Sequence, residues 1–298
     1  MRYLTSLLRP VAAASVLLLL LLTGCDSTSP NNTEEIAPDE TAEMIAVTLA
    51  EDNGGTADDL ASAQNYLQNL MTGANAVTPS SAKAVSRSYE RDCQYDEGDQ
   101  VWGCTVSATR STNRTDASFD RRVEVQFLDE SGEPRRAYEV NGEPAASLTY
   151  SLLSGSGSFD GPRMFSQHTV PAPDEPATFW TIDNPGTGLI TINGSGSRSV
   201  NNGQESFRGT RTRDAVITTQ ATDVVVERGE DIQSGTIAGT YDAQVELTNN
   251  DGDSVTRTIN VEYVATFSGD TVDITFTGGG ERFNGRSFTF SSATGEPV

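Results

Sequence analysis

Two cysteines, Cys93 and Cys104, have the spacing that points most directly to a chemical bond in this sequence. The ten residues between them read as strand, turn and strand around residues 97–100. Pairing the cysteines centres this hairpin between Gly98 and Asp99, a Gly-X turn suited to type II′. Directly opposed residues of an antiparallel pair have Cα atoms ~4.5 or ~5.5 Å apart, and both separations lie within disulfide range. The sequence therefore predicts a disulfide that closes a β-hairpin.

The same register places two aromatic residues, Tyr95 and Trp102, opposite each other. The alternative for the two cysteines is a free redox pair. Such pairs ordinarily lie closer together in the sequence, as in Cys-x-x-Cys. The hairpin symmetry favours the disulfide.

Catalytic chemistry has few candidate residues. His168 is the single histidine, so a Ser-His-Asp site would depend on it, and no serine has the Gly-x-Ser-x-Gly frame. Zinc sites need several His or Cys ligands, and no phosphate-cradling Gly-rich motif is present. We therefore predict no catalytic residue, no metal ligand and no cofactor. With 42 Asp and Glu, a glycosidase-type pair of carboxyl groups stays open.

One oxygen-rich segment, residues 249–253 (Asn-Asn-Asp-Gly-Asp), offers the ligand type that calcium takes. It lacks the bidentate Glu and the spacing of an EF-hand. It also lies where two alternating segments need a connection. We interpret it as a hairpin turn, with a calcium site as the alternative.

The charge balance limits the partners. The chain has 298 residues, with 20 Lys and Arg against 42 Asp and Glu, a net charge of −22. Nucleic-acid binding requires a basic surface, so a general nucleic-acid partner is not expected. Lys83 is the only lysine. An acidic, lysine-poor surface is typical of salt-adapted proteins, although genome composition could also favour arginine.

The N-terminus has the three zones of an export signal. Arg2 and Arg9 precede an apolar stretch, residues 11–22, which ends in Leu22-Thr23-Gly24-Cys25. Twelve residues are too few to cross a bilayer as a helix but suit a signal-peptide core. The end of this segment resembles the lipobox of bacterial lipoprotein precursors. The resemblance covers residues 1–25 alone.

The resemblance implies that residues 1–24 are a signal peptide that is removed and that Cys25 is acylated, for example with palmitate. Cys25 would then anchor the protein to a membrane of the bacterial cell envelope. Without Arg2 and Arg9 the mature chain keeps 18 Lys and Arg against 42 Asp and Glu, a net charge of −24. Export also permits the disulfide.

The chain after the anchor divides into three parts. Residues 25–38 form the lipid anchor and a flexible tether, because Ile36 is the one large apolar residue after Cys25. Residues 39–73 carry helical patterns, 39–51 and 56–73, around a Gly-Gly turn, and predict a helical hairpin. Its apolar stripe packs on the β domain or binds a partner.

Residues 84–298 alternate between apolar and polar residues with a period of two, which is typical of antiparallel strands with one wet side. Turn pairs such as Asn141-Gly142 separate the segments. Residues 213–227 would span roughly 50 Å as one straight strand, so we expect either bulges or strong curvature. The prediction is a mainly β fold: a curled antiparallel meander of about ten strands, open or closed.

The longest interruption of this pattern is a proline-rich segment, residues 160–177, which includes His168. We interpret it as a surface crossover, with the rim of a ligand site as the alternative.

Three functions are compatible with these patterns. The first is a lipid-anchored envelope protein that presents a non-catalytic β domain for binding or a structural role. The second is a carrier that holds an apolar ligand or a lipid in the curled sheet. The third is a carboxylate-dependent polysaccharide hydrolase, in which Trp102 or Trp180 flanks two carboxyl groups. The identity of a protein, glycan or apolar ligand does not follow from the sequence.

Overall fold

The computed structural model describes residues 36–50, 55–57, 59–60, 86–111, 116–160, 165–170, 178–185, 187–206, 209–227 and 232–298. The chain divides into two compact units, Met1–Ala37 and Pro38–Val298. The second unit contains every helix and strand named below. The predicted signal peptide, Cys25 and the tether as far as residue 35 lie outside the described residues and stay predictions.

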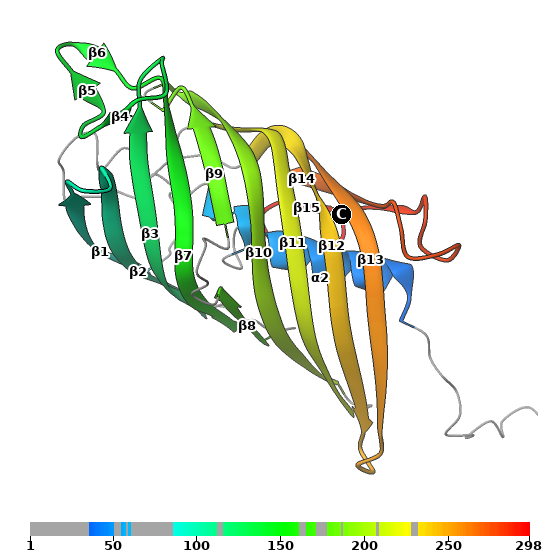
Figure 1. Ribbon diagram of the computed structural model, residues 1–298. Helices are drawn as coiled ribbons and strands as arrows, with labels where there is room; N and C mark the ends of the chain where they lie inside the picture. The colour runs from blue at the N-terminus through cyan, green and yellow to red at the C-terminus, as the bar shows by residue number, and fades with distance from the viewer. Residues whose placement is uncertain are drawn as a thin grey trace, which may run out of the picture. The chain divides into compact units, whose positions relative to one another are not determined.

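The second unit is mainly β, with one large antiparallel sheet (Figure 1). Its strands, together with the separate pair β5 and β6, follow one another along the chain. They are β1 (Ser86–Asp96), β2 (Val101–Ser111), β3 (Asp116–Leu128), β4 (Pro134–Arg135), β5 (Glu139–Val140), β6 (Glu143–Pro144), β7 (Ser147–Asp160), β8 (Phe165–Val170), β9 (Thr178–Asp183), β10 (Leu189–Ser206), β11 (Gly209–Glu227), β12 (Ile232–Asn249), β13 (Ser254–Ser268), β14 (Thr271–Phe276) and β15 (Ser287–Ser291).

The sheet is an open meander. Its order is β1-β2-β3-β7-β8-β10-β11-β12-β13-β14-β15, and β9 also lies between β7 and β10. β1 and β15 are the two ends of this order, so the sheet does not close into a barrel. The predicted curled antiparallel meander is confirmed. The sheet has thirteen strands rather than about ten, because short strands such as β4 and β8 have too little alternation to be recognised in the sequence.

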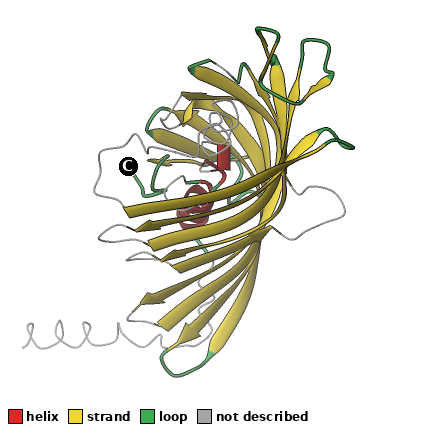
Figure 2. Ribbon diagram, turned by 90° about the vertical axis from the view of Figure 1, so that its left-hand side faces the viewer, coloured by secondary structure: helices red, strands yellow, loops and turns green. Residues whose placement is uncertain are grey.

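The longest strands lie side by side in the middle of the sheet. β10, β11 and β12 have 18, 19 and 18 residues. Register shifts interrupt them between Ile192 and Gly194 and between Thr222 and Val225. Bulges increase local twist and bend the strand, and the sheet is strongly curved (Figure 2). Both features expected of residues 213–227, bulges and curvature, are therefore present.

A helix lies in the curve of the sheet. It is α2 (Pro38–Leu49), with Asp39 and Glu40 in its first turn, where the helix dipole favours negative charge. We call the sheet face against α2 the concave face and the other the convex face (Figure 2). Met44 contacts Tyr241 of β12 on this face. The first predicted helix is confirmed, two residues shorter at its C-terminus than expected.

The second predicted helix is described only at its start, where residues 56–57 and 59–60 are helical. Residues 61–73 lie outside the described part, so the helical hairpin remains a prediction.

The core lies between the concave face and these helical residues. One row across the sheet consists of Ile217, Tyr241 and Val261 on β11, β12 and β13, and each is at most 1% exposed. Ile45 and Leu49 of α2 are equally buried. Burial of one face of every strand is what the period-two alternation predicts.

The proline-rich segment contains more structure than expected. We predicted a loop over residues 160–177, whereas residues 165–170 form β8, which pairs with both β7 and β10. Pairing with neighbours on both sides outweighs the weak local preference of this segment for a strand. His168 lies within β8, opposite Val200. Residues 161–164 and 171–177 are outside the described part.

Candidate functional site

Charged residues are segregated between the two faces of the sheet. Strand alternation puts arginines on the concave face, in line with the buried apolar residues, and puts many carboxylates on the convex face. The concave arginines with described side chains are Arg91, Arg121, Arg198, Arg211, Arg213 and Arg257. The convex carboxylates include Glu90, Asp92, Asp120, Glu124, Asp214, Asp242, Glu246, Glu262 and Asp273.

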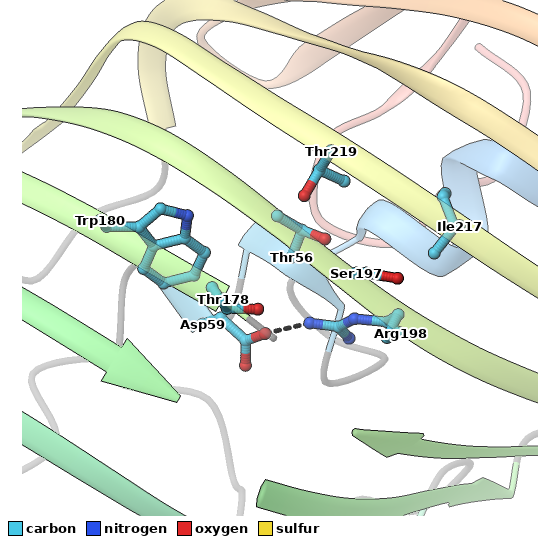
Figure 3. A pocket seen from close by; sticks show the side chains of 8 residues that line it. All are labelled: Thr56, Asp59, Thr178, Trp180, Ser197, Arg198, Ile217 and Thr219. Atoms are coloured by element: carbon cyan, nitrogen blue, oxygen red, sulfur yellow. Dashed lines mark hydrogen bonds and ion pairs between the residues drawn. The ribbon is translucent and has the colours of Figure 1, made fainter. Parts of the chain in front are cut away.

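Two of the concave arginines converge on one buried carboxylate. Asp59 forms an ion pair through one oxygen with Arg121 of β3. Its other oxygen forms an ion pair with Arg198 of β10 (Figure 3). The side chains of Asp59, Arg121 and Arg198 are 2%, 3% and 8% exposed. We call these three residues the Asp59 cluster. It ties a helical segment to two strands that lie far apart in the sequence.

A small cavity lies beside Asp59. Its volume is about 10 Å³, room for roughly one water molecule. Thr178 and Trp180 of β9 form part of its wall, and Arg198 forms another part (Figure 3). The remaining lining residues are Thr56, Ser197, Ile217 and Thr219.

The wall of this cavity depends on a glycine in the β10 bulge. Gly194 has a φ of +145°, and a Cβ atom there would lie 2.2 Å from the carbonyl oxygen of Phe179 and 2.9 Å from Cδ1 of Trp180. A larger residue would therefore displace Trp180. Trp180 is 1% exposed and stacks on Tyr150, with ring centroids 5.4 Å apart.

The second group of concave arginines lies on the long strands. The register places Arg213 of β11 between Asn202 of β10 and Val245 of β12, and Val245 lies opposite Arg257 of β13. Neighbouring strands are ~4.8 Å apart, so the Cα atoms of Arg213 and Arg257 are about 10 Å apart. Arg211 lies two residues from Arg213 on the same face. We call Arg211, Arg213 and Arg257 the arginine end.

Glu40 of α2 contacts the arginine end. Its Oε1 atom forms an ion pair with Arg211 and lies 3.6 Å from Nη2 of Arg213. The Nε atoms of Arg213 and Arg257 are buried and have no hydrogen-bond acceptor in the described part of the chain. The arginine end is therefore only partly compensated in charge and in hydrogen bonds.

Burial changes the acid–base properties of two side chains here. It lowers the pKa of Arg213 to about 10; Tyr241 and Glu43 raise this pKa, and Arg211 lowers it. Burial raises the pKa of Tyr241 to about 12, and the charge of Arg213 lowers it. At neutral pH Arg213 is thus a cation and Tyr241 is uncharged. Burial likewise raises the pKa of Tyr263.

The predicted cysteine pair is present in the structure. Cys93 lies opposite Cys104, with sulfur atoms 2.08 Å apart and Cα atoms 4.1 Å apart. Tyr95 lies opposite Trp102, as the register requires, and their ring centroids are 5.2 Å apart.

The type of turn predicted for this hairpin is wrong. The loop has four residues, 97–100, and Gln100 rather than Gly98 has a positive φ, of 56°. Oδ1 of Asp96 accepts hydrogen bonds from the backbone N–H groups of Gly98 (2.7 Å) and Asp99 (3.2 Å). This side-chain acceptor stabilises the longer loop in place of a type II′ turn.

The oxygen-rich segment 249–253 forms the turn between β12 and β13. Oδ1 of Asn249 accepts hydrogen bonds from the N–H groups of Asp251 (3.0 Å) and Asp253 (2.9 Å), and Gly252 has a φ of +90°. Among the described residues, no three His, Cys, Asp or Glu gather in a way that could hold a metal ion. No helix in the same part of the chain is long and apolar enough to span a membrane.

Sequence reasoning missed the arginine end and the Asp59 cluster. The signal for the arginine end was present, because Arg211 and Arg213 continue the odd-numbered series of Ala215 and Ile217. Asp59 read only as an acidic residue in the first turn of a helix, since its partners lie 62 and 139 positions away.

Comparison with known proteins gives no relative: no family model, no curated protein and no solved structure matches this chain.

Proposed function

We propose that this protein is a lipid-anchored component of a bacterial cell envelope that presents a non-catalytic β domain for binding. The anchor rests on the lipobox-like Leu22-Thr23-Gly24-Cys25 and the apolar segment before it. The binding role rests on one structural observation, the segregation of charge: arginines gather on the concave face of a chain whose net charge is −22. Three of these arginines, Arg121, Arg198 and Arg213, are buried, and a buried cation needs an anionic counterpart.

A non-catalytic role agrees with the state of the most buried carboxylate. Both carboxylate oxygens of Asp59 are engaged in ion pairs, one with Arg121 and the other with Arg198, so two guanidinium groups stand where a substrate would have to approach. Trp180, one of the two tryptophans expected to flank a hydrolase site, is buried in the wall of the cavity. These features favour binding over polysaccharide hydrolysis.

The carrier function is the second candidate, because the sheet is curled and lined with apolar residues on its inner side. The cavity beside Asp59, however, has about 10 Å³, whereas pockets for small molecules have ~300–1,000 Å³. α2 already covers part of the inner face with Ile45 and Leu49. Binding of polar groups by the arginines is therefore favoured over enclosure of an apolar ligand.

Fractionation of cells tests the anchor. Cys25→Ser should move the protein from the membrane fraction to the soluble fraction, because acyl chains on Cys25 would hold it there. Thr23→Ala, which installs a residue common at this lipobox position, is the matched control and should stay in the membrane fraction. The mass of the N-terminal peptide of the wild-type protein provides a second measurement. An unmodified precursor mass, together with unchanged partition of Cys25→Ser, would refute the anchor.

A further inference from the structure

We propose that the arginine end binds a phosphate group, presented either by the head group of an anionic lipid or by free inorganic phosphate. This inference rests on the proposed binding function and names the chemistry of its ligand.

The donor arrangement favours phosphate. The guanidinium groups of Arg211, Arg213 and Arg257 come from two strands and the same face of the sheet. An arginine side chain reaches several ångströms from its Cα atom, so groups whose Cα atoms are about 10 Å apart can meet on one anion. Arginine pairs with phosphate through two parallel N–H donors, which adds geometric specificity to charge.

Buried hydrogen-bond donors without an acceptor within the described part of the chain also indicate that the arginine end is the binding site. Arg213 is 6% exposed, and its Nε donates to no acceptor in the described residues; the buried Nε of Arg257 is in the same state. A buried donor without an acceptor lowers stability. A phosphate oxygen that accepts from both atoms would remove this cost. Between Arg121 and Arg198 an anionic group is already in place, because Asp59 forms ion pairs with both.

The charges that face the arginine end leave it positive. Glu40 contacts Arg211 and Arg213, and Glu43 acts on Arg213 electrostatically. Tyr241 is uncharged at neutral pH, because burial raises its pKa to about 12. Among the described residues, three cations thus face two carboxylates, and Glu40 has a side chain that is 28% exposed and so partly screened by solvent. An anion that enters this region gains more attraction than repulsion.

The proposed anchor brings a phosphate source within reach. Residues 25–38 would span at most about 50 Å when fully extended. A domain on such a tether stays close to lipid head groups. Free phosphate is the alternative source of the same chemical group, and the two are separated by experiment.

The test uses the whole mature chain, residues 25–298, with Cys25→Ser so that acyl chains do not carry it into vesicles. One arm titrates inorganic phosphate by calorimetry, with ionic strength held constant by NaCl. The other arm measures co-sedimentation with vesicles of phosphatidylglycerol and phosphatidylcholine, against vesicles of phosphatidylcholine alone. Arg257→Gln is the test variant. Arg122→Gln, an exposed arginine on the convex face of β3, is the matched control.

We expect saturable binding of phosphate that Arg257→Gln weakens at least tenfold and Arg122→Gln changes less than twofold. Selective sedimentation with phosphatidylglycerol, lost in Arg257→Gln, identifies a lipid as the source. Phosphate binding without vesicle binding identifies the free ion.

Three results would overturn the proposal: no saturable binding in either arm, equal weakening by both variants, or equal binding to both kinds of vesicle. If circular dichroism shows that Arg257→Gln does not fold, Arg257→Lys replaces it as the test variant for phosphate binding. It keeps the charge but loses the two-pronged donor, so binding should weaken severalfold, and unchanged binding contradicts the site. Failure in both arms leaves the proposed anchor standing if Cys25→Ser is still released from membranes.

Discussion

The Asp59 cluster and the arginine end place the same side chain on the same face of one sheet but in opposite electrostatic conditions. In the cluster, both arginines share a carboxylate that is 2% exposed, and neighbouring side chains leave room for about one water. At the arginine end, Glu40 is 28% exposed, and within the described part of the chain its ion pairs are with Arg211 and Arg213 and not with Arg257. The compensated group is suited to hold the fold together, whereas the uncompensated one is suited to receive an anion.

Removal of one carboxylate from each region should separate stabilisation of the fold from anion binding. The largest loss of stability is expected at Asp59. Asp59→Ala leaves two arginines buried without their partner, and loss of one member of a buried ion pair costs ~3–5 kcal/mol. Glu40→Gln at the more exposed arginine end should cost about 1 kcal/mol or less. Urea denaturation of both variants measures the difference.

Glu40→Gln should also bind phosphate more tightly than the wild type, because a competing negative charge is gone. If Asp59→Ala and Glu40→Gln lost equal stability, the contrast between the Asp59 cluster and the arginine end would be wrong. It would also be wrong if Glu40→Gln weakened phosphate binding.

Removal of the disulfide should affect the two regions unequally. Cys93 and Cys104 close a loop with a sequence separation of 11, and a bridge of this size contributes roughly 2–3 kcal/mol. Arg121 of the cluster lies on β3, next to the bridged hairpin, while the arginine end lies on β11 and β13. Cys93→Ala with Cys104→Ala should therefore lower the denaturation midpoint and leave the affinity for phosphate unchanged.

The state of the cysteines themselves is measured by mass spectrometry of unreduced peptides. Two thiols that can be alkylated in the exported protein would contradict the bridge.

Alkaline pH provides a third contrast, through Tyr241. Its pKa rises from the ordinary 10 to about 12 in the folded protein. Between these values the unfolded chain loses the tyrosine proton and the folded chain keeps it, so stability falls as pH rises. Arg213, whose pKa is lowered to about 10, acts in the opposite direction, because the folded state loses its proton first. Tyr241→Phe removes the destabilising contribution of the tyrosine.

Tyr241→Phe should therefore lose less stability than the wild type between pH 10 and 12. Denaturation midpoints across this range, referred to the values at pH 8, measure the effect. Parallel curves for the two proteins would show that Tyr241 ionises equally in the folded and unfolded states.

The sheet could be predicted from the sequence because its alternation is local. In β13, Ile259, Val261 and Tyr263 alternate with polar residues, and the structure buries all three. The cysteine register was predictable for a similar reason, since the two positions differ by 11 and a single turn lies between them. β8 was missed because its pairing with β7 and β10, not its own composition, makes it a strand.

The candidate site could be predicted less well, because it depends on long-range contacts. Period two places Arg211 and Arg213 on one face, but it does not say that Arg257 lies two strands away in the same row. Nor does it show that Asp59 reaches between β3 and β10. Register between distant strands and the position of α2 are properties of the whole fold.

The smallest predicted effect concerns the convex face, whose carboxylates contrast with the arginine end. Asp214 of β11 lies opposite Gln244, so Asp242 and Glu246 of β12 are its diagonal neighbours, at ~7–8 Å. These like charges repel across a distance shorter than the Debye length at 0.1 M salt, ~10 Å, and longer than that at 1 M, ~3 Å. Stability should therefore rise by about 1 kcal/mol, the scale of an exposed charge pair, between low and molar NaCl.

Asp214→Asn separates this effect from other actions of salt. It removes the charge shared by both diagonal contacts while the side chain keeps its shape, so the gain in stability between 0.1 and 1 M NaCl should shrink.

NaCl is the appropriate salt, because phosphate would also stabilise the arginine end by binding to the folded state. At equal ionic strength, phosphate should therefore stabilise the wild type more than chloride does. It should lose this advantage in Arg257→Gln but keep it in Asp214→Asn. A denaturation midpoint that is flat or falls with NaCl would contradict the prediction of carboxylate repulsion. If phosphate and chloride stabilised the wild type equally, the arginine end would not bind phosphate, and the proposed difference between the concave and convex faces would be wrong.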